Sequence, residues 1–337
     1  MGICTQEYWK FVYICDKMDA GFFYWPGCSA CFYMKYETVL ERQIGEMKNI
    51  TVKDIVNATG GFLLCGDEDT PIKGLCIDSR KAQAGDLFIP LLGNKVDGHR
   101  FIEPAMERAS ATLTSEHDNV VISEKPFIRV DDTMKALQAI GKDIRGRYDI
   151  PYIGVTGSVG KTTTREMIAA AVGTGRHCFQ TNGNENSQIG VPMTLSRMTD
   201  GYDAAVIEMG ISEPGQMEIL SDIVRPSICV VTMIGVAHIE FMKTQENIRD
   251  EKLSIVNHMK ENGLLLLNGD DPLLREIKDD MSCQTLTFGI DEVCDFQGSD
   301  VQCGEQGMEF DCTHNDDTVH VLSLIHISEP TRLRCIS

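Results

Sequence analysis

The chain has 337 residues, enough for about two domains that each bury a core of their own. Its hydrophobic content of 42% and charged content of 24% are typical of a globular protein and argue against global disorder. The formal net charge of −19 argues against nucleic acid or an anionic membrane as the main partner. No apolar run approaches the ~20 residues of a membrane span, and the 13 scattered cysteines fit reduced thiols, so we expect a cytoplasmic protein.

The first 46 residues differ in composition from the rest of the chain. They hold both tryptophans and almost half of all aromatic residues, and they show no sustained helical or strand period. An orderly pattern begins at Met47, so we predict that Met47 is the natural start and that 1–46 is upstream sequence; the alternative is an authentic extra element. Cys28 and Cys31 have the spacing of a metal or redox pair, but no matching second pair follows, which disfavours a zinc site.

The last 16 residues, 322–337, are also unusual. The segment Leu322-Ser-Leu-Ile-His-Ile-Ser-Glu-Pro-Thr-Arg332 resembles the read-through translation of a sequencing adapter. We therefore expect an assembly artefact there, with the true gene continuing beyond Val321. The alternative is a genuine short tail.

The body of the chain reads as α/β. Residues 47–150 form a first domain of mixed pattern, with a strand over 85–92 and a helix over 101–109. A second domain over 151–321 opens with a strand over 151–156, a glycine-rich loop and a helix from Lys161. Strands over 204–209, 227–232, 263–267 and 285–288 alternate with helices over 215–224, 244–260 and 272–279. This alternation predicts a mostly parallel, doubly wound sheet with its ligand site at the carboxyl ends of the strands. The alternating pattern after Gly298 predicts antiparallel strands there.

A glycine-rich segment, Thr156-Gly-Ser-Val-Gly-Lys-Thr-Thr163, joins the first of these strands to its helix. Its glycines allow the backbone to wrap a phosphate group, and amides at the helix N-terminus point toward that group. Lys161 would neutralise the outer phosphate oxygens, and Thr162 would offer a hydroxyl to Mg²⁺. Val155 stands where the standard loop has glycine, which implies a shortened loop. A chance Gly-Lys-Thr is disfavoured because the strand and the helix are both in place.

Further polar residues follow strands at the same predicted edge. Glu208 is a reasonable Mg²⁺ ligand, directly or through water. His238 alone would more often be a loop histidine than a ligand, but its place in a phosphate-binding domain favours a ligand. Asn268 is placed to hydrogen-bond a nucleotide base, although Asn268-Gly-Asp-Asp-Pro272 is by itself a good turn and helix cap.

Lys252 lies in an apolar stripe of the predicted helix over 244–260, with Ile248, Ile255, Val256 and Met259. Two explanations are open. The side chain either snorkels, with its ammonium group in water, or is a desolvated, nucleophilic amine at the active site.

Together these residues resemble the Mur ligases, ATP-dependent amide-forming enzymes of bacterial peptidoglycan synthesis, over about 47–321. The segment Thr181-Asn-Gly-Asn-Glu-Asn-Ser-Gln-Ile-Gly-Val-Pro-Met-Thr-Leu195 is similar to the branch that joins D-alanyl-D-alanine to UDP-N-acetylmuramoyl-tripeptide. Asp78-Ser-Arg-Lys81, Gly85-Asp-Leu-Phe88 and Asp97-Gly-His99 resemble a first-domain pattern shared with the ligase that adds the third residue. Ser187 and Met233 depart from the family, in which Asn is usual at both places.

The resemblance implies a role for each matching position. Ser79 and Arg80 would hold the UDP-sugar end, and Asn184 and Asn186 would lie near the substrate and phosphate. One Mg²⁺ would be bound by Thr162 and Glu208, and a second by His238. Lys252 would be carbamylated by CO₂ and become an anionic metal ligand, so that Lys161, His238 and Lys252 serve catalysis. The ATP-binding positions would be Gly157, Ser158, Val159, Gly160, Lys161, Thr162, Thr163 and, at the adenine, Asn268.

The implied reaction is phosphorylation of the tripeptide carboxylate by ATP to an acyl phosphate, followed by attack of the D-alanyl-D-alanine amine. Residues 47–150 would bind the UDP-sugar, and 151–321 would be the ATP-binding central domain, incomplete at its end. Family members have a third, Rossmann-like domain, which is missing here. We therefore expect this chain to bind UDP-substrate or ATP weakly and not to turn over. We also expect it to be a monomer.

Three alternatives remain open. One is another Mur-type ligase, either the third-residue-adding or the folylpolyglutamate type; the Asp-Ser-Arg motif disfavours the latter. The second is a P-loop GTPase or kinase, because Asn94-Lys-Val-Asp97 mimics a guanine-reading motif, although it precedes the phosphate loop instead of following it. The third is a nucleotide-binding protein without ligase activity.

Overall fold

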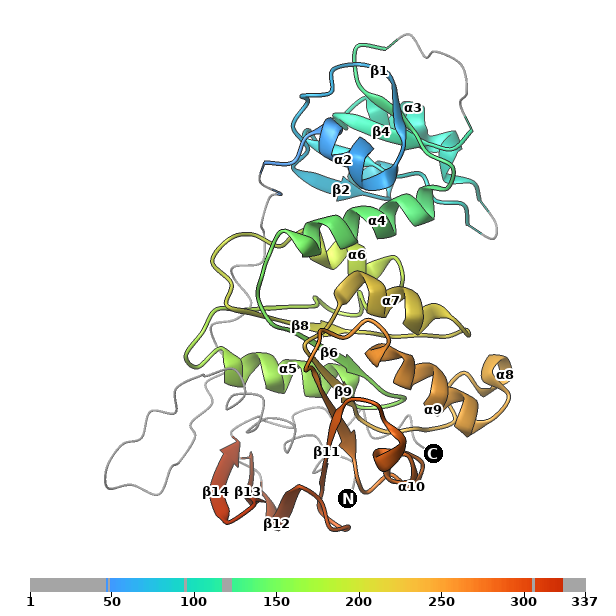
Figure 1. Cartoon of the computed structure of the whole chain (residues 1–337). Helices are drawn as coiled ribbons and strands as arrows, with labels where there is room; N and C mark the ends of the chain where they lie inside the picture. The colour runs from blue at the N-terminus through green and yellow to red at the C-terminus, as the bar shows by residue number, and fades with distance from the viewer. Residues whose placement is uncertain (1–46, 48, 94–95, 117–122, 305–306, 324–337) are drawn as a thin grey trace.

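The computed structural model describes residues 47, 49–93, 96–116, 123–304 and 307–323, which form two sheets flanked by helices (Figure 1). The predictions for 1–46, including Cys28 and Cys31, lie outside the described residues. Of the suspected adapter segment, only Leu322 and Ser323 are described. Their backbone continues the ladder of the last strand, with Leu322 paired to Glu309 and Ser323 to Met308.

The first sheet has five strands in the order β1-β5-β4-β3-β2. Only β1 and β5 are antiparallel neighbours; the other pairs are parallel. The strands are β1 Phe62–Cys65, β2 Gly74–Cys76, β3 Asp86–Phe88, β4 Ala111–Thr114 and β5 Phe127–Arg129. The helices are α2 Val52–Thr59, η1 Ser79–Lys81, η2 Gly98–Phe101, α3 Ile102–Met106 and α4 Thr133–Gly146.

Two elements of this region are shorter than predicted. The strand expected over 85–92 ends at Phe88, two residues before Pro90, which has no N–H to donate to a ladder. The helix expected over 101–109 is split into the 3₁₀ turn η2, capped by the Asp97 side chain, and the five-residue α3.

The second sheet has nine strands in the order β14-β13-β12-β11-β10-β9-β6-β8-β7. All neighbouring strands from β7 through to β12 in this order pair in parallel. The pairs β12–β13 and β13–β14 are antiparallel, as the pattern after Gly298 predicts. The strands are β6 Tyr152–Thr156, β7 Cys178–Gln180, β8 Ala204–Glu208, β9 Ile228–Val231, β10 Leu264–Asn268, β11 Gln284–Gly289, β12 Phe296–Gly304, β13 Gly307–His314 and β14 Asp317–Ser323. The doubly wound prediction is confirmed.

Helices cover both faces of this sheet. Its central strands are buried along their whole length, so they read as continuous apolar runs. Helix α5 packs in the core on one face, and the core on the other face includes residues of α6, α7, α9 and α10. The helices are α5 Lys161–Val172, α6 Gly190–Leu195, α7 Gln216–Val224, α8 Ile239–Met242, α9 Gln245–Leu253, η3 Ser254–Val256, α10 Pro272–Glu276 and η4 Lys278–Asp280.

The helix expected over 244–260 is shorter than predicted. It ends at Leu253 and continues only as the 3₁₀ turn η3, so Met259 lies outside it. The apolar positions are nevertheless buried at Ile248 and Ile255. The 3.6-residue period therefore marked the inward side correctly and overestimated the length.

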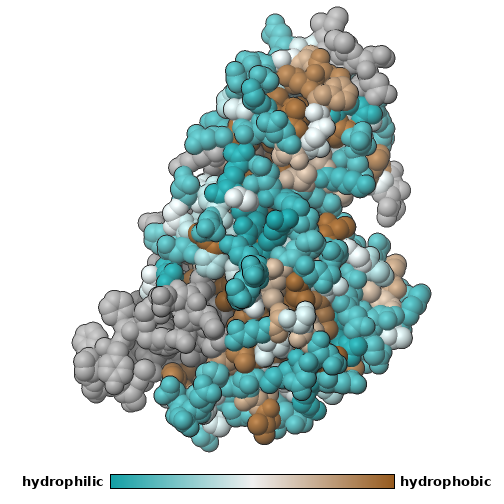
Figure 2. Space-filling view, viewed as in Figure 1, coloured by the Kyte–Doolittle hydropathy of each residue, from teal (hydrophilic) through white to brown (hydrophobic). Residues whose placement is uncertain are grey.

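Helix α4 lies between the two sheets (Figure 1). Its Ala136, Leu137, Ile140 and Ile144 belong to the core of the first sheet, while the helix also packs against α6 and α7 of the second. The face shown in Figure 2 is mostly hydrophilic, and a hydrophobic area lies at the top of the view, over the first sheet. Within the described residues, every helix is too short or too polar to cross a membrane.

Candidate active site

The carboxyl ends of β8, β6, β9 and β10 lie side by side at one edge of the second sheet. Val155 pairs with Glu208, Thr156 with Val231, and Val231 with Leu267. The loops that follow these strands therefore begin next to one another, as in other doubly wound sheets, where ligands bind at this edge. The sequence predictions at Lys161, Glu208 and Asn268 come together on this basis.

The phosphate loop is held close to the loop after β9. Gly157 has a φ of +148°, and a Cβ at that position would lie 1.8 Å from Thr232 Oγ1, so only glycine fits. The Ser158 N–H donates to the Met233 carbonyl at 2.8 Å, and Thr232 Oγ1 donates to the Val159 carbonyl at 2.5 Å. These bonds fix the backbone that leads into α5.

Several donors in this loop remain available for a ligand. Gly160 caps α5 in a left-handed conformation and offers no side-chain partner to the first helical amides. The buried hydroxyls of Thr156 and Ser158 have no hydrogen-bond partner among the described residues. Lys161 Nζ donates to the Gly157 carbonyl at 2.9 Å and so folds back over the loop. This arrangement suits an anion such as a phosphate group.

Glu208 is buried at the end of β8, and both of its carboxylate oxygens are hydrogen-bonded. Arg165 Nη1 donates to Oε2 at 3.2 Å, and Asn186 Nδ2 donates to Oε1 at 2.7 Å. The Glu208 N–H donates to Thr181 Oγ1 at 2.9 Å. Arg165 is itself fully buried and donates to the Gly183 carbonyl at 2.8 Å. The carboxylate is therefore held in one orientation.

Arg165 was missed by the sequence analysis. Its spacing could have revealed it, because it lies four residues after Lys161 and therefore on the same face of the predicted helix. Removing one partner of a buried ion pair such as Arg165–Glu208 strongly destabilises the folded protein, because the other charge is left unpaired in the interior.

Lys252 is buried, with 3% of the residue exposed. Burial, with a further contribution from nearby Lys161, lowers its pKa from 10.5 to about 7. The structure thus contradicts the snorkelling explanation and supports the desolvated amine. A lower pKa favours the unprotonated amine, which is the form that can act as a nucleophile.

Glu251, the neighbour of Lys252, anchors α9 to α7. Its carboxylate accepts the N–H groups of Gly215 and Met217, both at 2.9 Å, at the start of α7. Helix α7 has no cap of its own there, so Glu251 supplies one from another helix. The sequence analysis missed this residue as well, because a cap from a distant segment leaves no local pattern.

Other predicted residues lie nearby with different surroundings. His238 caps α8 with a φ of 64° and is exposed; its imidazole makes no hydrogen bond or ion pair with another described residue. Thr162 is half-buried in the first turn of α5, beside Thr163. Asn268 is buried, and its Oδ1 accepts the Asp270 N–H at 3.0 Å, as in an ordinary turn.

The residues predicted to hold the UDP-sugar lie with the first sheet, whereas Asn184 and Asn186 lie on a loop of the second sheet that reaches Glu208. Ser79 and Arg80 lie in η1 beside the first sheet, and Arg80 forms two side-chain hydrogen bonds with Asp78, at 2.9 and 2.8 Å. These bonds lower the pKa of Asp78 to about 2. Asn184 is exposed in the loop before α6, and its carbonyl accepts the Asn186 N–H at 2.8 Å.

The Asp97-Gly-His99 motif builds the local structure of the first sheet. The Asp97 carboxylate accepts the His99 N–H at 2.9 Å and lies 2.7 Å from His99 Nδ1. His99 Nε2 accepts the Ser115 N–H at 3.0 Å. Asp97, His99 and Glu116 bring potential ligand atoms within 4.8 Å of one another, but both nitrogens of the His99 ring are already engaged within the protein.

Comparison with protein families gives two matches. The Mur ligase middle domain matches residues 155–327, and the Mur ligase family, catalytic domain, matches residues 71–145. The chain is 40% identical over 262 residues to the UDP-N-acetylmuramoyl-tripeptide–D-alanyl-D-alanine ligase of Bacillus subtilis (strain 168), covering 77% of this chain and 57% of the relative. The protein of the same name from Synechocystis is 37% identical, covering 66% of this chain and 50% of the relative.

Solved structures give the same picture. A crystal structure of MurF from Acinetobacter baumannii matches with a TM-score of 0.75 and 27% identity, over 82% of this chain and 61% of that one. MurF ligase from Thermotoga maritima, solved in complex with ADP, matches with a TM-score of 0.67 and 31% identity, over 74% and 57% of the two chains. The chain thus spans between 50% and 61% of the length of these relatives.

Proposed function

The chain belongs to the Mur ligase family, and on that premise we propose that it is part of an ATP-dependent ligase that joins D-alanyl-D-alanine to UDP-N-acetylmuramoyl-tripeptide. The observation that carries the proposal is the meeting, at one sheet edge, of a phosphate loop, the oriented Glu208 and the buried Lys252. Residues 47–150 would bind the UDP-substrate and 151–321 would bind ATP. Because UDP-linked precursors and ATP are cytoplasmic compounds, the protein would act in the cytoplasm.

In the proposed reaction, an oxygen of the tripeptide carboxylate attacks the γ-phosphorus of ATP, the bond to the β-phosphate oxygen breaks, and ADP leaves. The amine of D-alanyl-D-alanine then attacks the acyl carbon, and phosphate leaves as the amide bond forms. The loop amides and Lys161 hold the phosphates in line for the first step. Asn184 and Asn186, on the loop before α6, would contact the substrate side of the site.

The side chains present suit Mg²⁺, which when bound would neutralise charge on the phosphate oxygens. The Thr162 hydroxyl and the oriented Glu208 carboxylate are hard oxygen ligands at the edge where ATP would lie. The exposed His238 imidazole is the candidate for a second ion.

Lys252 suits carbamylation on chemical grounds. Only an unprotonated amine adds to CO₂, and burial lowers the pKa of Lys252 to about 7. The carbamate would convert a cation beside Lys161 into an anion, so the two side chains would attract instead of repelling each other. Carbon-13 NMR with labelled bicarbonate should show a carbamate signal that is lost in Lys252→Arg.

Titration calorimetry tests the function as a whole. We expect ATP to bind in preference to GTP, with binding lost in Lys161→Ala, and UDP-N-acetylmuramoyl-tripeptide to bind better than the UDP-linked dipeptide. A preference for GTP would support the P-loop GTPase alternative, and a preference for the dipeptide would support a third-residue ligase. We expect no phosphate release by this chain; release that depends on both the tripeptide and D-alanyl-D-alanine would contradict that expectation.

A further inference from the structure

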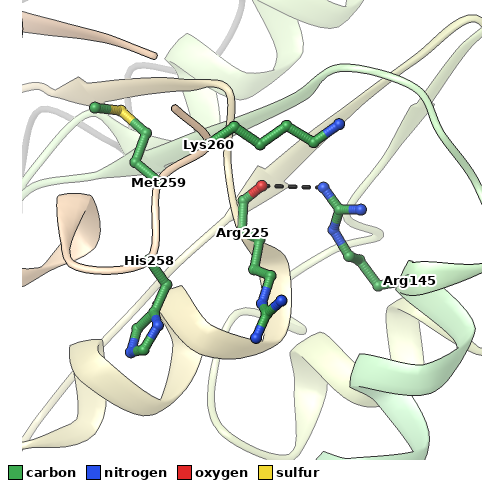
Figure 3. A pocket seen from close by; sticks show the side chains of 5 residues that line it. All are labelled: Arg145, Arg225, His258, Met259 and Lys260. Carbon is green, nitrogen blue, oxygen red and sulfur yellow. Dashed lines mark hydrogen bonds between the residues drawn. The ribbon is translucent and has the colours of Figure 1, made fainter. Parts of the chain in front are cut away.

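A cavity of about 320 Å³ lies at the edge of the second sheet opposite to the phosphate loop. It is lined by Arg145, Arg225, His258, Met259 and Lys260 (Figure 3). Arg145 comes from the last turn of α4, Arg225 lies three residues before β9, and Lys260 lies four residues before β10. The amino ends of the strands therefore surround it, and a five-residue strand separates it by about 16 Å from the carboxyl edge.

Arg145 is the buried member of this group, with 6% of the residue exposed. Its Nε donates to the Val224 carbonyl at 2.6 Å and its Nη2 donates to the Arg225 carbonyl at 3.0 Å, at the end of α7. The guanidinium also lies over the Tyr152 ring, 4.1 Å from its centre. Among the described residues it forms no ion pair, and Nη1 has no hydrogen-bond partner. Within hydrogen-bond distance its positive charge therefore meets only neutral groups of the described residues, and the Asp149 carboxylate interacts with it from beyond ion-pair distance.

Three carboxylates approach the basic side chains at the cavity, and Arg145 is the one of these side chains that forms no ion pair with any of them. Asp222 is shared by Lys142, Arg225 and His258, at distances of 2.6, 3.1 and 3.6 Å. Asp149 pairs with Lys260 at 3.0 Å but is itself almost fully exposed.

Glu218 accepts from His258 Nε2 at 2.7 Å. The charged groups that line the cavity itself are all basic, in a protein whose net charge is −19. Burial is the main cause that lowers the pKa of Arg145; the nearby Arg225 charge lowers it further, and Tyr152 and Asp149 offset only part of this.

We propose that this cavity is a second anion site, separate from the phosphate loop, and that it takes a phosphate group, free or as a small ester. The planar guanidinium of Arg145 would meet two phosphate oxygens, and Arg225 and Lys260 would supply the remaining charge. A doubly charged phosphate matches several converging cations better than a single carboxylate. Met259 forms the apolar part of the wall.

Titration calorimetry of the full chain with inorganic phosphate at low ionic strength tests the site. Because the phosphate loop also binds anions, the measurement is made in the Lys161→Ala variant. We expect binding to persist there and to weaken about tenfold or more when Arg225→Gln and Lys260→Gln are added. The backbone carbonyls that accept hydrogen bonds from Arg145 remain in both substitutions. Both replaced side chains are at least 40% exposed, so we expect the fold to be preserved. Circular dichroism checks that it is.

The matched control is Lys53→Gln, which removes another exposed lysine with a carboxylate partner, Glu68, that does not line the cavity. It should leave phosphate binding unchanged. The proposal is overturned if Lys161→Ala abolishes phosphate binding, if chloride at the same ionic strength gives the same heat, or if Lys53→Gln weakens binding as much as the double substitution does.

Discussion

The Lys252 amine is buried beside a second lysine, and this placement costs folding free energy. Its pKa is about 7 in the folded protein and 10.5 in the unfolded chain. Between these values the unfolded chain binds more protons, so this residue's contribution makes stability rise with pH across that window; below about pH 7 the full cost remains. Stability therefore does not account for a lysine at this position.

We predict that Lys252→Met raises the free energy of unfolding by about 1–4 kcal/mol at pH 7, because a buried cation is replaced by an apolar side chain of similar size. The gain should shrink as the pH approaches about 10. Urea unfolding at several pH values measures it. Lys135→Met, at an exposed position of α4, is the control. Equal effects of the two substitutions, or a gain that does not change with pH, would contradict the prediction.

At the scale of elements, the phosphate loop depends on a close approach between two loops. Gly157 leaves no space for a Cβ against Thr232, and its φ of +148° is open only to glycine. We predict that Gly157→Ala weakens ATP binding by about tenfold or more, because the loop must shift away from Thr232. Titration calorimetry measures this effect.

Gly175 provides the matched control, since nothing lies within 4 Å of a Cβ at that position and its φ is ordinary. Gly175→Ala should bind ATP as the parent chain does. Undiminished ATP binding by Gly157→Ala would show that the loop is not built as described.

For the molecule as a whole, α4 connects the two sheets, because it packs on the core of the first sheet and against helices α6 and α7 of the second. Its Gly141 lies against α6, where a Cβ would come within 2.8 Å of the Pro192 Cβ and 2.9 Å of its Cα. Helix α6 directly follows the loop that carries Asn186, and the Asn186 side chain donates a hydrogen bond to Glu208. The packing of the first sheet's helix is therefore connected to the geometry of the candidate active site.

We predict that Gly141→Ala lowers the free energy of unfolding by about 1–3 kcal/mol, because Pro192 is backbone-rigid and cannot move aside easily. Gly146→Ala, at the end of the same helix and with nothing within 4 Å of its Cβ position, should be neutral or stabilise by up to about 1 kcal/mol. Denaturant unfolding compares the two. A loss of similar size in both would show that the contact with Pro192 is not the cause.

Much of this fold was predictable from local pattern. Three features depend only on residues close together in the chain: the apolar run Leu264–Leu267, the glycine-rich loop and the apolar period around Ile248. The sequence therefore predicted the strands, the phosphate loop and the inward side of α9. Boundaries were less accurate where a local interruption outweighed the pattern, as at Pro90 and after Leu253. The resemblance to Mur ligases likewise rested on contiguous motifs.

The amino-acid sequence by itself determined the fold class, the phosphate loop and the candidates Glu208 and Lys252, because these depend on the order of residues along one segment. Only the tertiary structure decided that Lys252 is desolvated, that Arg165 and Asn186 orient Glu208, and that Arg145, Arg225 and Lys260 surround one cavity. Burial and charge pairing are set by groups tens of residues apart in the chain. The physical reason is that the pKa of an amine or the orientation of a carboxylate depends on its neighbours in space, which the sequence does not list.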